Sequence, residues 1–390
     1  MTGFLARAYA FKFFDAFILI FPLYTVMFAD AGLTPTQIAI CLAAWSLVGF
    51  ALQIPSGVIA DRRPRRTILA LAQLSRGAGF AVWLAYPHFW GFFVGLVLWG
   101  AKSAFTNGTF EALLFDALKD AGRAQSYTRL YGRMRAVQSS AVLAAALGAA
   151  VAARWGYGTI LAASLVSVGV ASLTAFSLPP TAPASSASGR GYLAHLRLGL
   201  SAAFRSPPVL SILAFSAIVL ALGAALEEFW PIFGAKVGLS RPVIAVFVGG
   251  QSLLEALASL AAFRFAAFPR QAFHLLFALA GAMLLAASAL FTAPAMLLLA
   301  AYSGLMKLIA VVFEGRLQHA IGSESRATVG SAKSLVSQIG VTALYLSFGP
   351  IAQASSYRIA FMACGLAGLV IALGYLARAA VRSQAPEAAA

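Results

Sequence analysis

The most constraining feature of this chain is a succession of long apolar segments joined by short connections. A helix needs about 20 predominantly apolar residues to cross the hydrocarbon core of a bilayer. The segments are continuous rather than alternating, which favours membrane helices over a closed β-barrel. We place them at residues 8–29, 36–60, 67–86, 90–114, 136–153, 159–178, 209–234, 242–263, 271–291, 295–316, 331–352 and 359–378.

Composition supports the same fold class. Hydrophobic residues make up 61% of the chain and charged residues 10%, whereas soluble domains carry about 25% charged residues. The sequence therefore predicts an all-α integral membrane protein with twelve transmembrane helices.

Positive charge is concentrated on one side of the predicted membrane. When the N-terminus is placed in the cytoplasm, 21 of the 28 Lys and Arg residues fall in or beside the inner connections. The outer connections hold Arg154, Lys236, Arg241 and Arg358. Because positive loops remain in the cytoplasm, we expect a multi-pass protein of the inner (cytoplasmic) membrane with both termini in the cytoplasm. The net charge of +16 then reflects this orientation and not binding to nucleic acid.

The two halves of the chain carry similar features in the same order. The matching pairs are Phe110-Glu111 with Phe313-Glu314 and Arg123-Ala124 with Arg326-Ala327 at an offset of 203, Lys102 with Lys307 at 205, and Gly32 with Gly238 at 206. Such a period indicates a duplicated unit of six helices, an architecture of secondary transporters. We expect two pseudo-symmetric six-helix bundles at 1–178 and 209–382, a cytoplasmic linker with an amphipathic stretch at 179–208, and a disordered tail at 383–390.

A compact charged motif follows the second apolar segment and reads Gly57-Val58-Ile59-Ala60-Asp61-Arg62-Arg63-Pro64-Arg65-Arg66. It resembles the signature of the major facilitator superfamily (MFS), G-x-x-x-D-[R/K]-x-G-[R/K]-[R/K], with Pro64 in place of the second glycine. The resemblance implies the MFS fold and an inner gate. The gate residues it implies are Gly57, Asp61, Arg62, Arg65 and Arg66, with Asp116 as the partner of Arg65. The simpler alternative is that these charges only hold the loop on the inner side.

Ionisable residues inside the apolar segments are costly to place in lipid and therefore indicate a polar cavity. We expect the substrate cavity to include Asp15, Lys102, Glu227, Glu228, Lys307 and Gln338. In the alternative, the two lysines form fixed salt bridges and Asp15 pairs locally with Lys12, three residues before it.

Two pairs of carboxylates have more specific expected roles. Adjacent carboxylates repel each other in a medium of low dielectric, so we expect one of Glu227 and Glu228 to hold a proton and to serve proton coupling. Alternatively, one of them faces the outer water and the other bonds a neighbouring helix. Glu111 and Glu314, at the inner ends of their segments, are expected to complete the inner gate.

The function predicted from these features is secondary transport of a small organic solute by alternating access, as proton-coupled efflux. A proton-coupled uptake symporter is the alternative, and a non-transporting membrane sensor is less favoured. No G-x-x-x-x-G-K-[ST] string is present to bind ATP, and two Cys and four His lack ligand spacing. We therefore expect no metal, no cofactor and no enzymatic activity, and a monomer whose partners are the solute, protons and membrane lipid.

Overall fold

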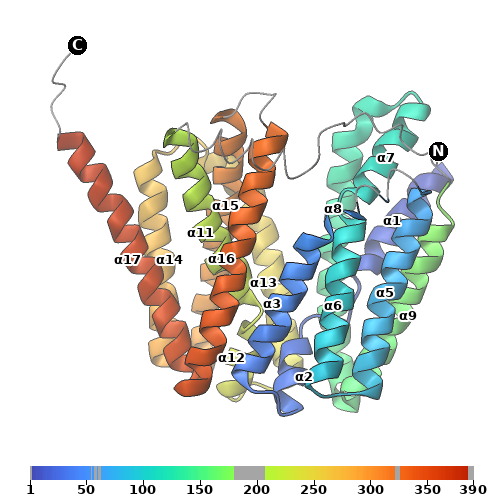
Figure 1. Ribbon diagram of the computed structural model, residues 1–390, viewed down its shortest axis with the longest axis horizontal. Coiled ribbons are helices and arrows are strands. Elements are labelled where there is room, and N and C mark those ends of the chain that lie inside the picture. The colour runs from blue at the N-terminus through green and yellow to red at the C-terminus, as the bar shows by residue number, and fades with distance from the viewer. Residues whose placement is uncertain are drawn as a thin grey trace. The chain divides into compact units, whose positions relative to one another are not determined.

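The computed structural model describes residues 2–53, 55–56, 59, 63–179, 207–320 and 326–384. Within these ranges the regular structure is helical throughout, without a strand (Figure 1). Ten helical segments of the described chain are long and apolar enough to cross a membrane. The two other expected crossings correspond to an interrupted helix at the N-terminus and to the shorter apolar helix Pro35–Ala51. The predicted all-α membrane fold class is confirmed.

The chain forms two compact units. Unit 1 contains Met1–Tyr192 and Ser240–Ser252, and unit 2 contains Leu193–Leu239 and Leu253–Ala390. The change from one unit to the other falls inside the expected linker at 179–208. Most of this linker, with its amphipathic stretch, lies outside the described residues. The division into bundles at 1–178 and 209–382 stays a prediction.

Unit 1 is built around a helix that packs between two others. Its helices are α1 (Thr2–Ala16), α2 (Tyr24–Asp30), α3 (Pro35–Ala51), α5 (Arg65–Ala85), α6 (Phe89–Thr106), α7 (Thr109–Asp120), α8 (Tyr127–Ala152) and α9 (Tyr157–Phe176), with short 3₁₀ turns at Ala124–Ser126 and Ala153–Trp155. α5 contacts α6 and α9, α3 contacts α6, and α1 contacts α8 and α9 (Figure 1). A Cβ atom on Gly79 of α5 would lie 2.8 Å from the Gly95 carbonyl oxygen of α6. Small residues thus permit the close helix approach typical of membrane bundles.

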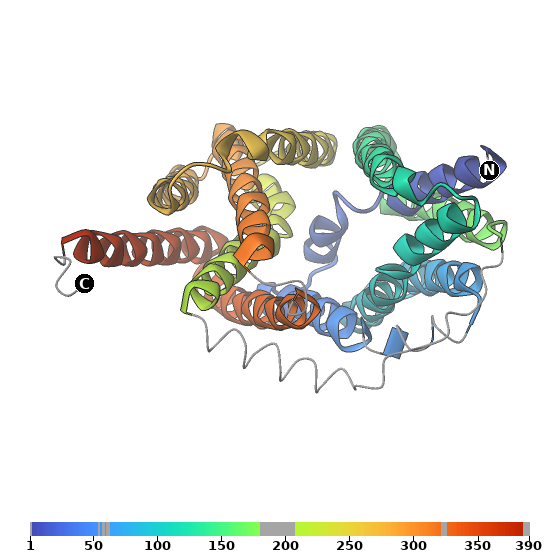
Figure 2. The ribbon, with the colours of Figure 1, turned by 90° about the horizontal axis from the view of Figure 1, so that it is seen from above.

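Two expected membrane segments of unit 1 are interrupted. The first leaves the helical path between α1 and α2, at residues 17–23 (dark blue in Figure 2). α9 satisfies the released backbone groups there, since Ser164 Oγ accepts from Ile20 N at 3.0 Å and Ser167 Oγ donates to Phe14 O at 3.0 Å. Such compensation is needed wherever a helix breaks at membrane depth. The expected helix at 90–114 ends at Thr106 and resumes after Gly108, whose φ of +79° favours glycine.

Unit 2 contains the remaining helices. They are α11 (Pro207–Glu227), α12 (Trp230–Lys236), α14 (Arg270–Leu290), α15 (Met296–Ala320), α16 (Arg326–Ala354) and α17 (Tyr357–Gln384), with 3₁₀ turns at Ala262–Phe265 and Ala293–Ala295. α13 (Arg241–Ala261) contributes its first part to unit 1 and its last part to unit 2. α14 contacts α15 and α17, and α11 contacts α15 and α16 (Figure 1). Residues 383–384 of the expected disordered tail belong to α17 and are helical, a correction to the predicted boundary; residues 385–390 are outside the described chain.

Candidate functional site

A cluster of buried polar side chains joins three helices of unit 1. It contains Asp15 of α1, Gln73 and Arg76 of α5, and Lys102 of α6, and we call it the Asp15 cluster. Asp15 Oδ1 lies 2.5 Å from Lys102 Nζ, 2.8 Å from Gln73 Nε2 and 3.3 Å from Arg76 Nη2. Arg76 also donates to the Asp15 backbone carbonyl at 3.0 Å and to Gln73 Oε1 at 2.6 Å. All four residues are less than 10% exposed.

The Asp15 cluster contains more positive than negative charge. One carboxylate contacts an ammonium and a guanidinium, and the Arg76 Nε atom is buried without a hydrogen-bond partner in the described chain. The Trp99 ring lies 6.0 Å from the guanidinium, which adds a cation–π contact. An uncompensated buried charge is costly. The cluster can therefore be neutralised by an incoming anion or by loss of the Lys102 proton.

Two of the four residues of the Asp15 cluster were predicted from the sequence. Asp15 and Lys102 were predicted as cavity residues and lie together, whereas Gln73 and Arg76 were not included. The available signal was Arg76 itself, a charge inside an apolar segment with a polar side chain three residues before it on the same helix face. The alternative that Asp15 pairs with Lys12 does not describe the structure, because Lys12 Nζ instead lies 3.6 Å from Glu111 Oε1.

Glu111 stabilises the helix break next to the Asp15 cluster. Its Oε2 accepts from Gly108 N at 2.9 Å, and its Oε1 accepts from Tyr131 Oη at 3.3 Å. A carboxylate at this position caps the first turn of α7 and interacts favourably with the positive end of the helix dipole. The described contacts of Glu111 thus fit helix capping and a partly buried ion pair with Lys12. Its role in an inner gate stays a prediction.

The expected pairing at the charged motif is present. The Arg65 guanidinium donates to Asp116 Oδ2, and Arg66 Nη1 donates to Leu178 O at 3.5 Å. Gly57, Asp61 and Arg62 lie outside the described residues. The Arg65–Asp116 contact is therefore observed, and the gate to which it was assigned is still a prediction.

Unit 2 holds a cavity of about 310 Å³ with charged and apolar walls. Its charged residues are Glu227 of α11, Lys307 and Glu314 of α15, and Lys333 of α16. The other lining residues are Val219, Leu220, Gly223, Ala224, Met306, Ala310 and Val311. The sequence predicted Glu227 and Lys307 for the cavity and Glu314 for a gate, and missed Lys333. Two other predicted cavity residues do not line this cavity. Gln338 is half-buried on α16, and Glu228 is half-buried just after the end of α11.

Two carboxyl groups meet beside this cavity. The Glu227 carboxyl group lies in close contact with that of Glu255 on α13. Two ionised carboxylates at such a distance repel each other, so the contact favours a proton shared by the pair. Glu255 was not predicted for the site, because no sequence spacing relates it to Glu227.

The two lysines of the cavity differ in their surroundings. Lys333 Nζ pairs with Glu314 Oε2, and Gln318 Nε2 donates to Glu314 Oε1 at 2.9 Å. Lys307 is exposed, and among the described residues no carboxylate lies within 4.0 Å of its ammonium. The cavity therefore offers one exposed ammonium without a direct ion pair among the described residues and, beside it, two carboxyl groups in contact.

Comparison with known proteins identifies the family. Residues 5–340 match the family model of the Major Facilitator Superfamily. The crystal structure of nucleoside transporter NupG is similar to this chain with a TM-score of 0.78 and 13% identity over 96% of this chain and 98% of that one. The D-xylose-proton symporter has a TM-score of 0.68 at 12% identity, covering 95% of each chain.

A curated relative matches over a shorter region. Multidrug resistance protein MdtH from Cronobacter sakazakii is 29% identical over 115 residues, which is 29% of this chain and 29% of its own length. With the family match spanning most of the sequence, the chain belongs to the Major Facilitator Superfamily and is a multi-pass membrane transporter.

Proposed function

We propose that this protein exports a small organic solute across the cytoplasmic membrane by alternating access, in exchange for protons. The observation that carries the proposal is the contact between the Glu227 and Glu255 carboxyl groups beside a cavity of about 310 Å³. Alternating access exposes such a group to each side of the membrane in turn. A carboxyl pair that gains and loses one proton in step with this exposure couples transport to the proton gradient.

Export follows if the solute carries a positive group. An ammonium and a proton then compete for the same carboxyl pair, so the site holds one or the other, and their movements are opposed. The apolar walls, among them Val219, Leu220 and Met306, would take the hydrophobic part of such a solute. The partial match to a protein named for multidrug resistance supports this direction.

Uptake by symport is the second candidate, and the exposed Lys307 favours it. A solute carboxylate would bind the Lys307 ammonium when Glu227 is protonated, because an ionised Glu227 would itself attract that ammonium. Proton and anion would then be bound together and move in the same direction.

The sign of proton movement separates the two candidates. The protein is reconstituted into liposomes that contain a pH-sensitive dye, and candidate solutes, selected by thermal stabilisation of the detergent-solubilised protein, are added outside. Exchange makes the lumen more alkaline as the solute enters, whereas symport makes it more acidic. Glu227→Gln should abolish proton movement in either case. Solute flux that ignores both the pH gradient and this substitution would refute proton coupling.

A matched control is available in the same unit. Glu314→Gln removes a carboxylate that lines the same cavity but is paired with Lys333. We expect this variant to retain a proton signal of unchanged sign. Loss of the signal in Glu314→Gln but not in Glu227→Gln would transfer the coupling role to the Glu314–Lys333 pair.

A further inference from the structure

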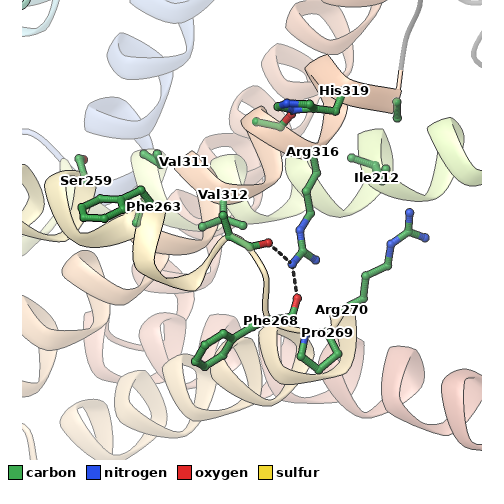
Figure 3. A pocket seen from close by; sticks show the side chains of 14 residues that line it. Ile212, Ser259, Phe263, Phe268, Pro269, Arg270, Val311, Val312, Arg316 and His319 are labelled. Carbon is green, nitrogen blue, oxygen red and sulfur yellow. Dashed lines mark hydrogen bonds between the residues drawn. The ribbon is translucent and has the colours of Figure 1, made fainter.

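A second and larger cavity lies in unit 2, where the last turn of α13 leads into α14. Its volume is about 900 Å³, and Figure 3 shows the side chains that line it. Three of them are basic, Arg270, Arg316 and His319. None of the lining residues in the described chain carries a carboxylate.

The basic side chains of this cavity are positioned in different ways. The Arg316 guanidinium donates to the carbonyl oxygens of Ala266 and Phe268 (Figure 3). It also lies over the Phe273 ring, 4.5 Å from the ring centroid. Arg270 is exposed, and no ion pair with it occurs in the described chain. It is also the first residue of α14, where the helix dipole places additional positive charge. The cavity therefore combines a fixed cation, a free cation and a positive helix end.

Comparison of the two repeats shows which charge the described part of this cavity lacks. Pro64-Arg65 and Pro269-Arg270 correspond at an offset of 205, and each pair supplies the N-cap and first residue of a 21-residue helix. Asp116, the partner of Arg65, corresponds to His319 at the offset of 203 that also relates Glu111 to Glu314. The first repeat thus neutralises its arginine with a carboxylate, whereas the second repeat places a histidine there.

We propose that this cavity binds the phosphate group of an anionic phospholipid, which supplies the charge that His319 does not. The apolar surroundings favour a lipid over a free anion: Phe263 is 74% exposed and Leu260, on the preceding turn, is 72% exposed. These side chains offer a surface for acyl chains next to the basic groups. Basic pockets between membrane helices bind lipid head groups on the cytoplasmic side, which is the side that the charge bias predicts for this end of α14.

The test uses the full-length protein in detergent with added cardiolipin, phosphatidylcholine or inorganic phosphate. Binding is followed by native mass spectrometry and thermal stabilisation. We expect saturable binding of cardiolipin and at least ten-fold weaker binding of the other two. Equal binding of phosphatidylcholine, or full stabilisation by inorganic phosphate alone, would overturn the proposal.

Variants locate the site. Arg270→Gln and His319→Asp should each weaken cardiolipin binding about ten-fold, and His319→Asp should keep the protein folded because it rebuilds the pair seen in the first repeat. Arg270→Lys and the outer-side control Arg154→Gln should retain binding. Unchanged affinity in both Arg270→Gln and His319→Asp would overturn the assignment. Glu324, the next carboxylate along the chain, lies outside the described residues. If cardiolipin binds only to the Glu324→Gln variant, Glu324 itself supplies the negative charge, and the proposal is overturned.

Discussion

The charge imbalance in the Asp15 cluster predicts that substitutions of its members destabilise the protein by different amounts. Asp15→Asn removes the carboxylate that both Lys102 and Arg76 contact and leaves two buried cations without an anion. Removing one partner of a buried ion pair costs about 3–5 kcal/mol. Lys102→Met instead removes the surplus cation, and Asp15 keeps its contacts with Arg76 and Gln73. We expect this second change to cost less than about 1 kcal/mol.

The assay is thermal unfolding of the purified variants, followed by tryptophan fluorescence in one detergent. For a unit of this size about 1 kcal/mol corresponds to roughly 2–4 °C in Tm, so Asp15→Asn should lower Tm by about 6–20 °C and Lys102→Met by only a few degrees. Adding Lys102→Met to Asp15→Asn should recover part of the loss, since one of the two unpaired cations is then gone.

A substitution on the protein surface serves as the control. Arg135→Gln alters an exposed arginine whose side chain contacts Gln138 at 3.4 Å, and it should leave Tm unchanged. If Lys102→Met destabilises the protein as much as Asp15→Asn, the lysine is not surplus and the charge argument fails. If Asp15→Asn leaves Tm unchanged, the cluster is too well hydrated for the cost of burying a charge to apply.

Three further sets of substitutions test the structure. Gly108→Ala should lower the unfolding free energy by about 1–2 kcal/mol, because φ is +79° there. Gly132→Ala in α8, where an added Cβ would meet open space, should raise it by about 0.5–1 kcal/mol. Chemical denaturation measures both changes, and equal effects would contradict the backbone argument. Arg65→Asp and Asp116→Arg should each impair solute flux, and the double swap should recover it if the pair acts as a gate; no recovery would assign the effect to other contacts. Asp30→Asn breaks an exposed ion pair with Arg241 and should lower the unfolding free energy by no more than about 1 kcal/mol. High salt should reduce this difference; a difference that stays the same in high salt would contradict the assignment of the pair to the surface.

The sequence predicts contacts well where the helix phase is continuous. The repeat offset of 205 placed Lys307 at the position equivalent to Lys102. Lys307 and Glu314, seven residues apart on α15, line the same cavity. The pairing of Arg65 with Asp116 followed from the family resemblance and is present.

Prediction fails where the helix breaks. The sequence treated 8–29 and 90–114 as continuous helices, and a break resets the direction in which every later side chain points. The alternative of a Lys12–Asp15 pair relied only on their spacing along one helix, whereas the structure pairs Lys12 with Glu111, which is oriented by the break at Gly108. Nothing in a helical period reveals such a partner, because it depends on which helices pack together.

The two charge clusters also constrain how many protons a transport cycle can move. Glu227 contacts Glu255 and also interacts with Lys307 and Glu228. Loss of a proton shared by Glu227 and Glu255 would leave adjacent carboxylates that repel each other. Unit 1 has the opposite balance, because one carboxylate, Asp15, contacts two cations, Arg76 and Lys102. If the proposed coupling holds, we expect one proton per solute from the carboxyl pair in the liposome assay. A ratio of two that falls to one in Lys102→Met would mean that the Asp15 cluster takes part in coupling as well.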